Sequence, residues 1–177
     1  MKNTVLLVVD VQTALIEEHP YNENAVVANI KNMISTCRVQ GIEVIYVRHD
    51  GGVGDELERN TAGWSIYEDI SPMDNEKVFD KQYNSAFRNT GLKEYLERKD
   101  IQNIILVGMQ TEHCIDATCK VAFEYGYQVI IPEDTTTTYD NLVLSGKALS
   151  DYYTQHIWNH RYAKVVSIEQ LNEDLLV

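Results

Sequence analysis

Six short apolar runs alternate with longer segments of helical periodicity along this chain. The apolar runs, rich in β-branched residues, cover residues 4–10, 43–48, 76–81, 103–108, 127–132 and 163–167, and the helical segments cover residues 22–41, 88–100, 112–126 and 140–160. Apolar strands joined by helices are typical of a parallel sheet that is buried on both faces. We therefore predict an α/β fold for residues 1–177: a single doubly wound, Rossmann-like domain with a six-stranded, mostly parallel sheet and helices on both faces.

The charge of the chain limits the class of partner. It has 15 basic and 27 acidic residues, a formal net charge of −12. Nucleic acids and anionic membranes require a basic surface, so we expect neither as a partner. A small molecule or another protein is favoured.

The location and redox state follow from the N-terminus and the cysteines. The first residues, MKNTVLLVVDVQ, show no signal-peptide cleavage site, and no apolar run reaches the roughly 18 residues of a membrane span. Cys37, Cys114 and Cys119 are odd in number and lack the spacing of a disulfide framework or a metal site. We expect a cytoplasmic protein with free thiols.

Three residues with chemical potential stand at or beyond the ends of predicted strands. Asp10 closes the first strand, Lys81 closes the third, and Cys114 follows the fourth. Ligands of doubly wound sheets bind at the carboxyl ends of the strands, where the strand order reverses. In the common order 3-2-1-4-5-6 the first and fourth strands are neighbours, which would place Asp10 and Cys114 across one crevice.

Each of these residues also has a structural interpretation. An aspartate after a strand is often the first polar residue of a loop, a lone lysine is usually on the surface, and a buried cysteine is usually an inert small hydrophobe. Cys114 differs because it falls in the first turn of a predicted helix, where the dipole favours a thiolate. Together the three residues predict amide hydrolysis: Asp10 takes the thiol proton, the thiolate attacks a carbonyl carbon, and Lys81 stabilises the charges.

The motifs around these residues resemble those of a known family. LLVVDVQ (6–12), the segment from Lys81 to Phe87, and VGMQTEHCIDATC (107–119) are similar to the isochorismatase-like cysteine hydrolases, which include nicotinamidases and N-carbamoyl amidohydrolases. The resemblance implies a catalytic triad of Asp10, Lys81 and Cys114, a cis peptide bond between Met109 and Gln110, and an oxyanion hole made by the amides of Gln110 and Cys114. It also implies a homo-oligomer, a dimer or a tetramer.

The sequence departs from the family where nicotinamidases bind a metal. His49 stands where those enzymes have an aspartate, and Gly51 stands where they have the first of their metal-binding histidines. We therefore expect no metal and no other cofactor.

The substrate pocket is harder to predict. Residues 49–75 form a long polar segment with little periodicity, and such loops are commonly functional. Within it, Trp64 could stack on a flat substrate or pack the loop onto the sheet. Gln12 could bind the substrate or cap the turn after the first strand, and Leu15 and Tyr83 are further pocket candidates that could equally belong to the core.

The predicted function is thus a cysteine-dependent hydrolase that cleaves the C–N bond of a small amide or ureide through a thioester. The alternative is a non-catalytic member of the same fold that binds a small molecule or a partner protein.

Overall fold

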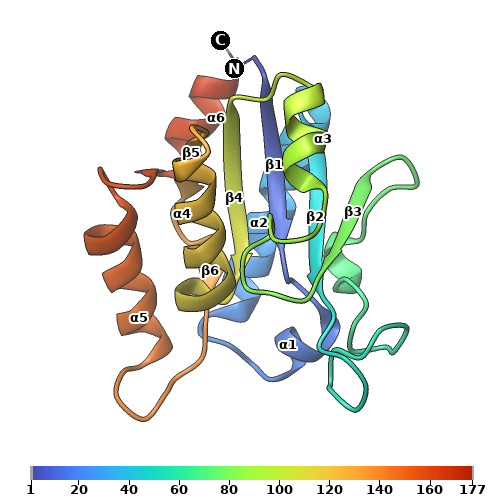
Figure 1. Ribbon diagram of the computed structural model, residues 1–177. Helices are drawn as coiled ribbons and strands as arrows, with labels where there is room; N and C mark the ends of the chain where they lie inside the picture. Colours follow the sequence, from blue (N-terminus) through green and yellow to red (C-terminus); the bar gives the residue numbers. More distant parts are fainter. Residues whose placement is uncertain (1, 177) are drawn as a thin grey trace.

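A parallel β-sheet runs through the middle of the molecule in the computed structural model, which describes residues 2–176 (Figure 1). Its strands are β1 (Thr4–Val9), β2 (Glu43–His49), β3 (Lys77–Lys81), β4 (Asn103–Met109), β5 (Gln128–Pro132), β6 (Thr136–Thr137) and β7 (Lys164–Val166). The order is β3-β2-β1-β4-β5-β7, with β6 paired to β4, and all of these pairings are parallel. The predicted α/β fold and the order of the six predicted strands are confirmed, and β6 is an additional short strand.

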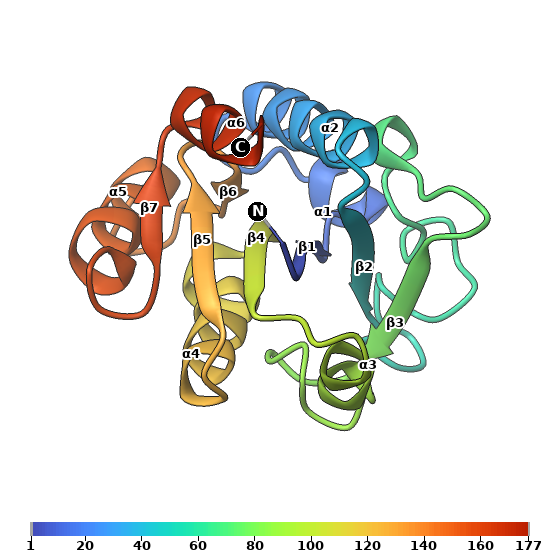
Figure 2. The ribbon, with the colours of Figure 1, turned by 90° about the horizontal axis from the view of Figure 1, so that it is seen from above.

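Helices cover both faces of the sheet (Figure 2). One face carries α2 (Glu23–Val39) and α6 (Ile168–Leu176), and the opposite face carries α3 (Leu92–Arg98) and α4 (Asp116–Glu124). The remaining helical elements are α1 (Thr13–Glu17), the 3₁₀ turn η1 (Glu68–Ile70), the π-helical turns η2 (Thr111–Ile115) and η3 (Tyr153–Trp158), and α5 (Gly146–Tyr152). Each predicted helical segment contains a helix, whereas α1 and α6 were not predicted.

The core follows from the alternation of side chains along β1. Leu6 and Val8 point to the face that α2 covers, and Val5, Leu7 and Val9 point to the face of α3 and α4. All five are essentially inaccessible to solvent. Burying each such side chain contributes about 1.5–3 kcal/mol, so the strands need apolar residues at both alternating positions.

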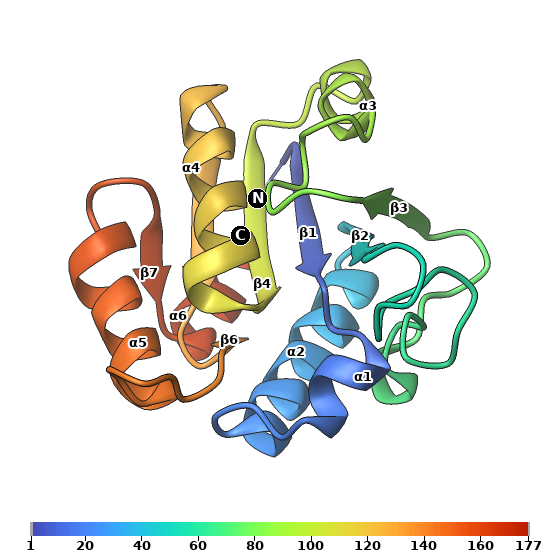
Figure 3. The same cartoon turned by 60° about the horizontal axis from the view of Figure 1, so that its bottom comes forward.

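From β1 the chain continues through β2 and β3 toward one edge of the sheet, and from β4 it continues through β5 and β7 toward the other edge. The strand order therefore reverses between β1 and β4, which are neighbours in the sheet. Gly108 pairs with Val9 there, at φ +127°, and a Cβ atom on it would lie 2.0 Å from the carbonyl oxygen of Val9. Only glycine fits this approach. The two strands can therefore deliver Asp10 and the turn after β4 to the same edge, which comes forward in Figure 3.

The long segment after β2 packs against this edge. An isolated antiparallel bridge joins Gln12 to Ile66, and Leu57, Trp64 and Ile70 are buried. The segment is thus anchored to the sheet at several points.

Among the helices described for residues 2–176, none combines the length and the apolar character that a membrane crossing would need.

Candidate active site

Asp10 and Lys81 form a buried ion pair at the carboxyl ends of β1 and β3. Asp10 directly follows β1 with φ 55°, a left-handed conformation that aspartate tolerates better than most residues, and its amide donates to the carbonyl of Val47 at 2.8 Å. Lys81 is the last residue of β3. Its Nζ lies 2.6 Å from Oδ2 of Asp10, and the two side chains are 0% and 2% exposed.

The ammonium group of Lys81 has two further partners. Its Nζ lies 3.2 Å from Sγ of Cys114 and 3.2 Å from Nδ1 of His49. His49 and Lys81 are register partners on β2 and β3, which explains why their side chains meet. Because an ammonium group can only donate, Nδ1 of His49 accepts, and the hydrogen of the neutral imidazole is on Nε2. All three hydrogens of Lys81 thus have an acceptor.

The protonation states follow from burial and from these neighbours. Burial lowers the pKa of His49, and the charge of Lys81 lowers it further. Burial also raises the pKa of the Cys114 thiol to about 12, with a contribution from Asp10 that outweighs the opposing effect of Lys81. The helix dipole was predicted to favour a thiolate, but desolvation of the sulfur has the larger effect on this pKa. Cys114 is a neutral thiol at rest and needs a base.

The turn after β4 brings Gln110 and Cys114 together. The peptide bond between Met109 and Gln110 is cis, and the carbonyl of Gln110 accepts hydrogen bonds from the amides of His113 and Ile115 at 3.1 and 3.2 Å. Cys114 lies within the π-helical turn η2, directly before α4. The backbone around the thiol is therefore fixed on both sides.

The loop after β3 closes another side of the site. Its Ala86 amide donates to Oγ1 of the buried Thr118 on α4 at 3.0 Å, which ties the loop to the helix that follows Cys114. Asn84 lies in this loop, and its Oδ1 is 4.0 Å from Sγ of Cys114. The amide of Asn84 is thus within reach of a group bound to the sulfur.

These residues surround a cavity of about 220 Å³. Its walls come from the ends of β1, β2 and β4, from α1 and η2, from the loop after β3 and from the long segment after β2. The lining residues are Asp10, Leu15, His49, Asp55, Glu56, Leu57, Asn84, Gln110, His113 and Cys114. Of the predicted pocket residues, Leu15 lines the cavity. Gln12, Trp64 and Tyr83 lie outside its lining.

Gln12 holds the long segment in place. Its Nε2 donates to the carbonyls of His49 at 3.0 Å and Trp64 at 2.9 Å, and its Oε1 accepts from the amide of His49 at 2.7 Å. The residue is fully buried. The side-chain amide of Gln12 therefore bonds to backbone groups, which favours the structural alternative over substrate binding.

Trp64 and Tyr83 both stack against arginines. The guanidinium of Arg48 lies 3.4 Å from the centroid of the Trp64 ring, and Trp64 is 7% exposed. The guanidinium of Arg88 lies 3.7 Å from the centroid of the Tyr83 ring. Trp64 thus packs the long segment onto the sheet.

Several cavity residues were not predicted from the sequence as part of the site. The contact of His49 with Lys81 depends on the register of β2 with β3, which was not predicted. Asp55, Glu56 and Leu57 belong to the long segment, whose length alone marked it as functional. Asn84 falls inside the Lys81–Phe87 motif, so its position in that motif was a usable signal.

The residues present do not fit the metal site of nicotinamidases. Gly51 has no side chain to offer, and Nδ1 of His49 faces the ammonium group of Lys81. Within residues 2–176 no three His, Cys, Asp or Glu side chains are grouped so that they could hold a metal ion.

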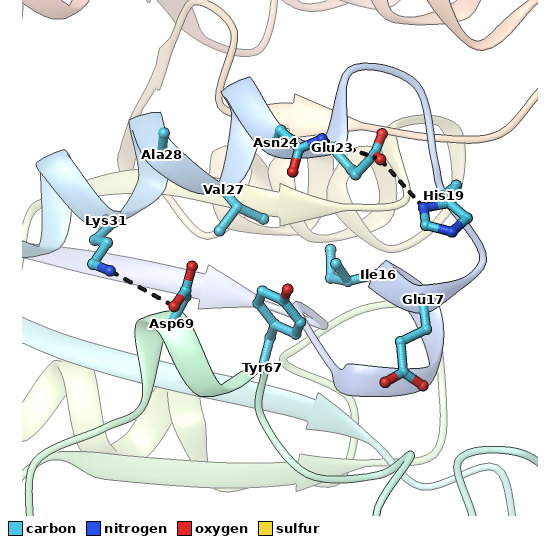
Figure 4. Close-up of a pocket in the computed structure, with 10 residues that line it drawn as sticks. All are labelled: Ile16, Glu17, His19, Glu23, Asn24, Val27, Ala28, Lys31, Tyr67 and Asp69. Atoms are coloured by element: carbon cyan, nitrogen blue, oxygen red, sulfur yellow. Dashed lines mark hydrogen bonds and ion pairs between the residues drawn. The ribbon is translucent and has the colours of Figure 1, made fainter.

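A larger cavity of about 350 Å³ lies elsewhere, between α1, α2 and η1 (Figure 4). None of the predicted site residues lines it. Four of its charged or titratable side chains form two pairs: Nδ1 of His19 lies 3.3 Å from Glu23, and Nζ of Lys31 lies 3.7 Å from Asp69. The chemically active groups are gathered in the smaller cavity.

Known proteins are similar to this chain over most of its length. Residues 4–170 match the model of the isochorismatase domain. Streptothricin hydrolase of Streptomyces noursei is 31% identical over 137 residues, which cover 76% of this chain but only half of that protein. Ureidoacrylate amidohydrolase RutB of Agrobacterium fabrum is 25% identical over 171 residues, covering 75% of each chain.

The fold has close structural counterparts. A crystal structure of an isochorismatase family protein superimposes with a TM-score of 0.87 at 27% identity, covering 94% of this chain and 99% of that one. The predicted resemblance is thus confirmed, as is the predicted class of a hydrolase at the level of the family. The chain belongs to the isochorismatase domain family.

Proposed function

We propose that this protein is a cysteine hydrolase that cleaves the C–N bond of a small amide or ureide. The observation that carries the proposal is the arrangement around Lys81, whose single ammonium group contacts the carboxylate of Asp10 and the thiol of Cys114 at the wall of one cavity. Membership of a family with named amidohydrolases supports this class of substrate. The catalytic residues would be Asp10, Lys81 and Cys114.

In the first half of the reaction, Asp10 acts as the base. Its Oδ1 is buried and has no hydrogen-bond partner among the described residues, so a lone pair is free to take the proton of the Cys114 thiol. Sγ then forms a bond to the carbonyl carbon, and the carbonyl oxygen takes up the negative charge. The backbone amides of Gln110 and Cys114 would donate to this oxyanion, and the ammonium group of Lys81 offsets the negative charge near the sulfur.

Collapse of the tetrahedral intermediate breaks the C–N bond. Asp10 returns its proton to the leaving nitrogen, which departs as ammonia or an amine and leaves a thioester on Cys114. Asp10 then takes a proton from water, the hydroxide attacks the thioester carbon, and the C–S bond breaks. The sulfur recovers a proton, and the acid product leaves.

The proposal is tested by ammonia release from a panel of small amides and ureides, with and without a chelator. We expect release that is insensitive to the chelator, abolished in Cys114→Ala and retained in the matched variant Cys119→Ala. If the native protein releases no ammonia from any compound, the alternative of a non-catalytic binding protein is favoured.

The homo-oligomer that the family resemblance implies stays a prediction, as does a single domain for residues 1–177. Light scattering coupled to size exclusion tests the first, and limited proteolysis tests the second. A mass of 20.3 kDa in solution would contradict the oligomer.

A further inference from the structure

Two carboxylates stand in the wall of the catalytic cavity without a cation. Asp55 and Glu56 lie in the long segment after β2, are exposed to solvent, and line the same cavity as Cys114. Oδ1 of Asp55 accepts from the amide of Leu57 at 2.8 Å, which orients this carboxylate. Neither residue forms an ion pair within the described part of the chain.

The arginines close to this segment are already engaged. Arg59 lies 3.3 Å from Asp50 and 3.4 Å from Asp80, and Arg48 lies 2.6 Å from Asp80. Asp50 and Asp80 thus have a counter-charge from these arginines, whereas Asp55 and Glu56 do not.

The cavity itself supplies no free positive charge. Lys81 faces the carboxylate of Asp10, and burial keeps the neighbouring His49 neutral by lowering its pKa. His113 lies 3.7 Å from Glu112. The charge that a bound molecule meets in this cavity is therefore negative.

Glu56 also faces a like charge. Partial desolvation raises its pKa, and the carboxylate of Glu18 raises it further. A cation bound at this point would relieve the repulsion, because it gives both carboxylates an opposite charge.

A second, independent feature points to a ligand with N–H groups. Asp10 lines the same cavity and is only 2% exposed, and its Oδ1 has no hydrogen-bond partner among the described residues. A buried acceptor of this kind is normally satisfied, so the molecule that fills the cavity should bring a donor, as the nitrogen of an amide or ureide does.

We propose, building on the proposed function, that the substrate is a cationic amide: a primary amine or guanidinium at one end binds Asp55 and Glu56, and the amide at the other end lies between Asp10 and Cys114. The long segment then selects substrates by charge. The net charge of −12 would assist, because it attracts cations toward the protein.

The test uses three compounds that share one amide and differ in the tail: 6-aminohexanamide, hexanamide and adipic acid monoamide. Binding to Cys114→Ala is measured by calorimetry at low salt, and ammonia release by the native protein is measured separately. We expect the cationic compound to bind about tenfold more tightly than hexanamide, equivalent to about 1.4 kcal/mol, and the anionic one to bind more weakly than either. Adding Asp55→Asn and Glu56→Gln should bring the ratio of the two affinities close to one, whereas Glu17→Gln, which removes one charge at the other cavity, should leave the ratio unchanged.

The two proposals fail in different ways. If the three compounds bind equally, or if the ratio survives the Asp55→Asn and Glu56→Gln substitutions, the cationic substrate is wrong whatever the activity. If the charge preference is found but neither these compounds nor the wider panel release ammonia, the binding site stands and the proposed hydrolase is wrong.

Discussion

Nζ of Lys81 and Oδ2 of Asp10 are 2.6 Å apart in a part of the molecule that solvent hardly reaches. A buried ion pair costs desolvation of both charges, so removing one partner leaves the other charge without compensation. We expect Lys81→Met to lower the free energy of unfolding by about 3–5 kcal/mol. Chemical denaturation of the variant and of the native protein measures this difference.

The double variant of this pair provides the control. With Asp10→Asn added to Lys81→Met, no unpaired charge remains, so the loss should be smaller than the sum of the two single losses. Additive losses would show that the two side chains are not coupled.

Asp10→Asn removes the proposed base while it keeps the size of the side chain. Positioned bases typically contribute about 10²- to 10⁴-fold to a rate, and we expect a loss of kcat/KM in this range. Circular dichroism checks that the variant is folded. Full turnover in a folded variant would rule out Asp10 as the base.

The same variant should change the reactivity of Cys114 in the opposite direction. Asp10 raises the pKa of the thiol, so its removal lowers this pKa and increases the thiolate fraction at neutral pH. We expect iodoacetamide to label Cys114 faster in Asp10→Asn than in the native protein, and more slowly in Lys81→Met. Mass spectrometry of labelled peptides measures both rates.

The other two cysteines serve as internal references for labelling. Cys37 and Cys119 are fully buried, and burial raises the pKa of each to about 12, as for Cys114. Because Cys114 alone of the three has access to the cavity, it should be labelled first in the native fold. Equal rates for all three would contradict a reactive Cys114.

The lowered pKa of His49 predicts that acid pH destabilises the folded protein. Its folded-state pKa lies below its ordinary value of 6.5, so the unfolded chain binds more protons as the pH falls through 6.5. The stabilising contribution of neutral His49 is thus complete above pH 6.5 and is lost progressively below it. Protonation of Nδ1 of His49 would also remove one of the three acceptors of Lys81.

Asn is the informative replacement for His49, because its Oδ1 can take the place of Nδ1 without titrating. We expect His49→Asn to flatten the decline in stability and in kcat/KM between pH 6.5 and 5, and the exposed His156→Asn to leave it unchanged. An unaltered decline in His49→Asn would assign it to another group.

The hydrogen bonds of Gln12 predict that one substitution will change both the free energy of unfolding and substrate binding. Replacing it by Leu leaves the amide and carbonyl of His49 and the carbonyl of Trp64 without partners inside the protein. Each buried unpaired group costs about 1–3 kcal/mol, so unfolding should become easier by at least about 2 kcal/mol. KM should rise as the long segment loosens, and the exposed Gln155→Leu is a control for the loss of an amide.

The sequence predicted the large elements because their physical signals are long. The apolar, β-branched runs of β1, β2 and β4 and the periodicity of α2 each extend over six or more residues. The two residues of β6 and the five of α1 are too short to show a period, and their positions depend on packing against β4 and on the bridge of Gln12 to Ile66. Short elements of this kind follow from the tertiary structure.

The candidate site shows the same division. Asp10, Lys81 and Cys114 stand at strand ends or in a helical turn that the pattern marks, and the structure brings them within contact around one ammonium group. The thiol's protonation was predicted less well, because desolvation of Cys114 depends on how much protein covers the sulfur. Asp55 and Glu56 were missed because a loop without periodicity does not reveal which side chains turn inward.

The parallel sheet determines what a return of activity during refolding would mean. Asp10, Lys81 and Cys114 come from the ends of three different strands, and each parallel pairing needs a long crossover through another element. A slip of one residue in the pairing of β1 with β4 would turn every side chain of the displaced strand to the other face. No fragment that lacks one of these strands holds all three residues of the proposed triad. Recovery of turnover during refolding would therefore report that the central strands have paired in their native register.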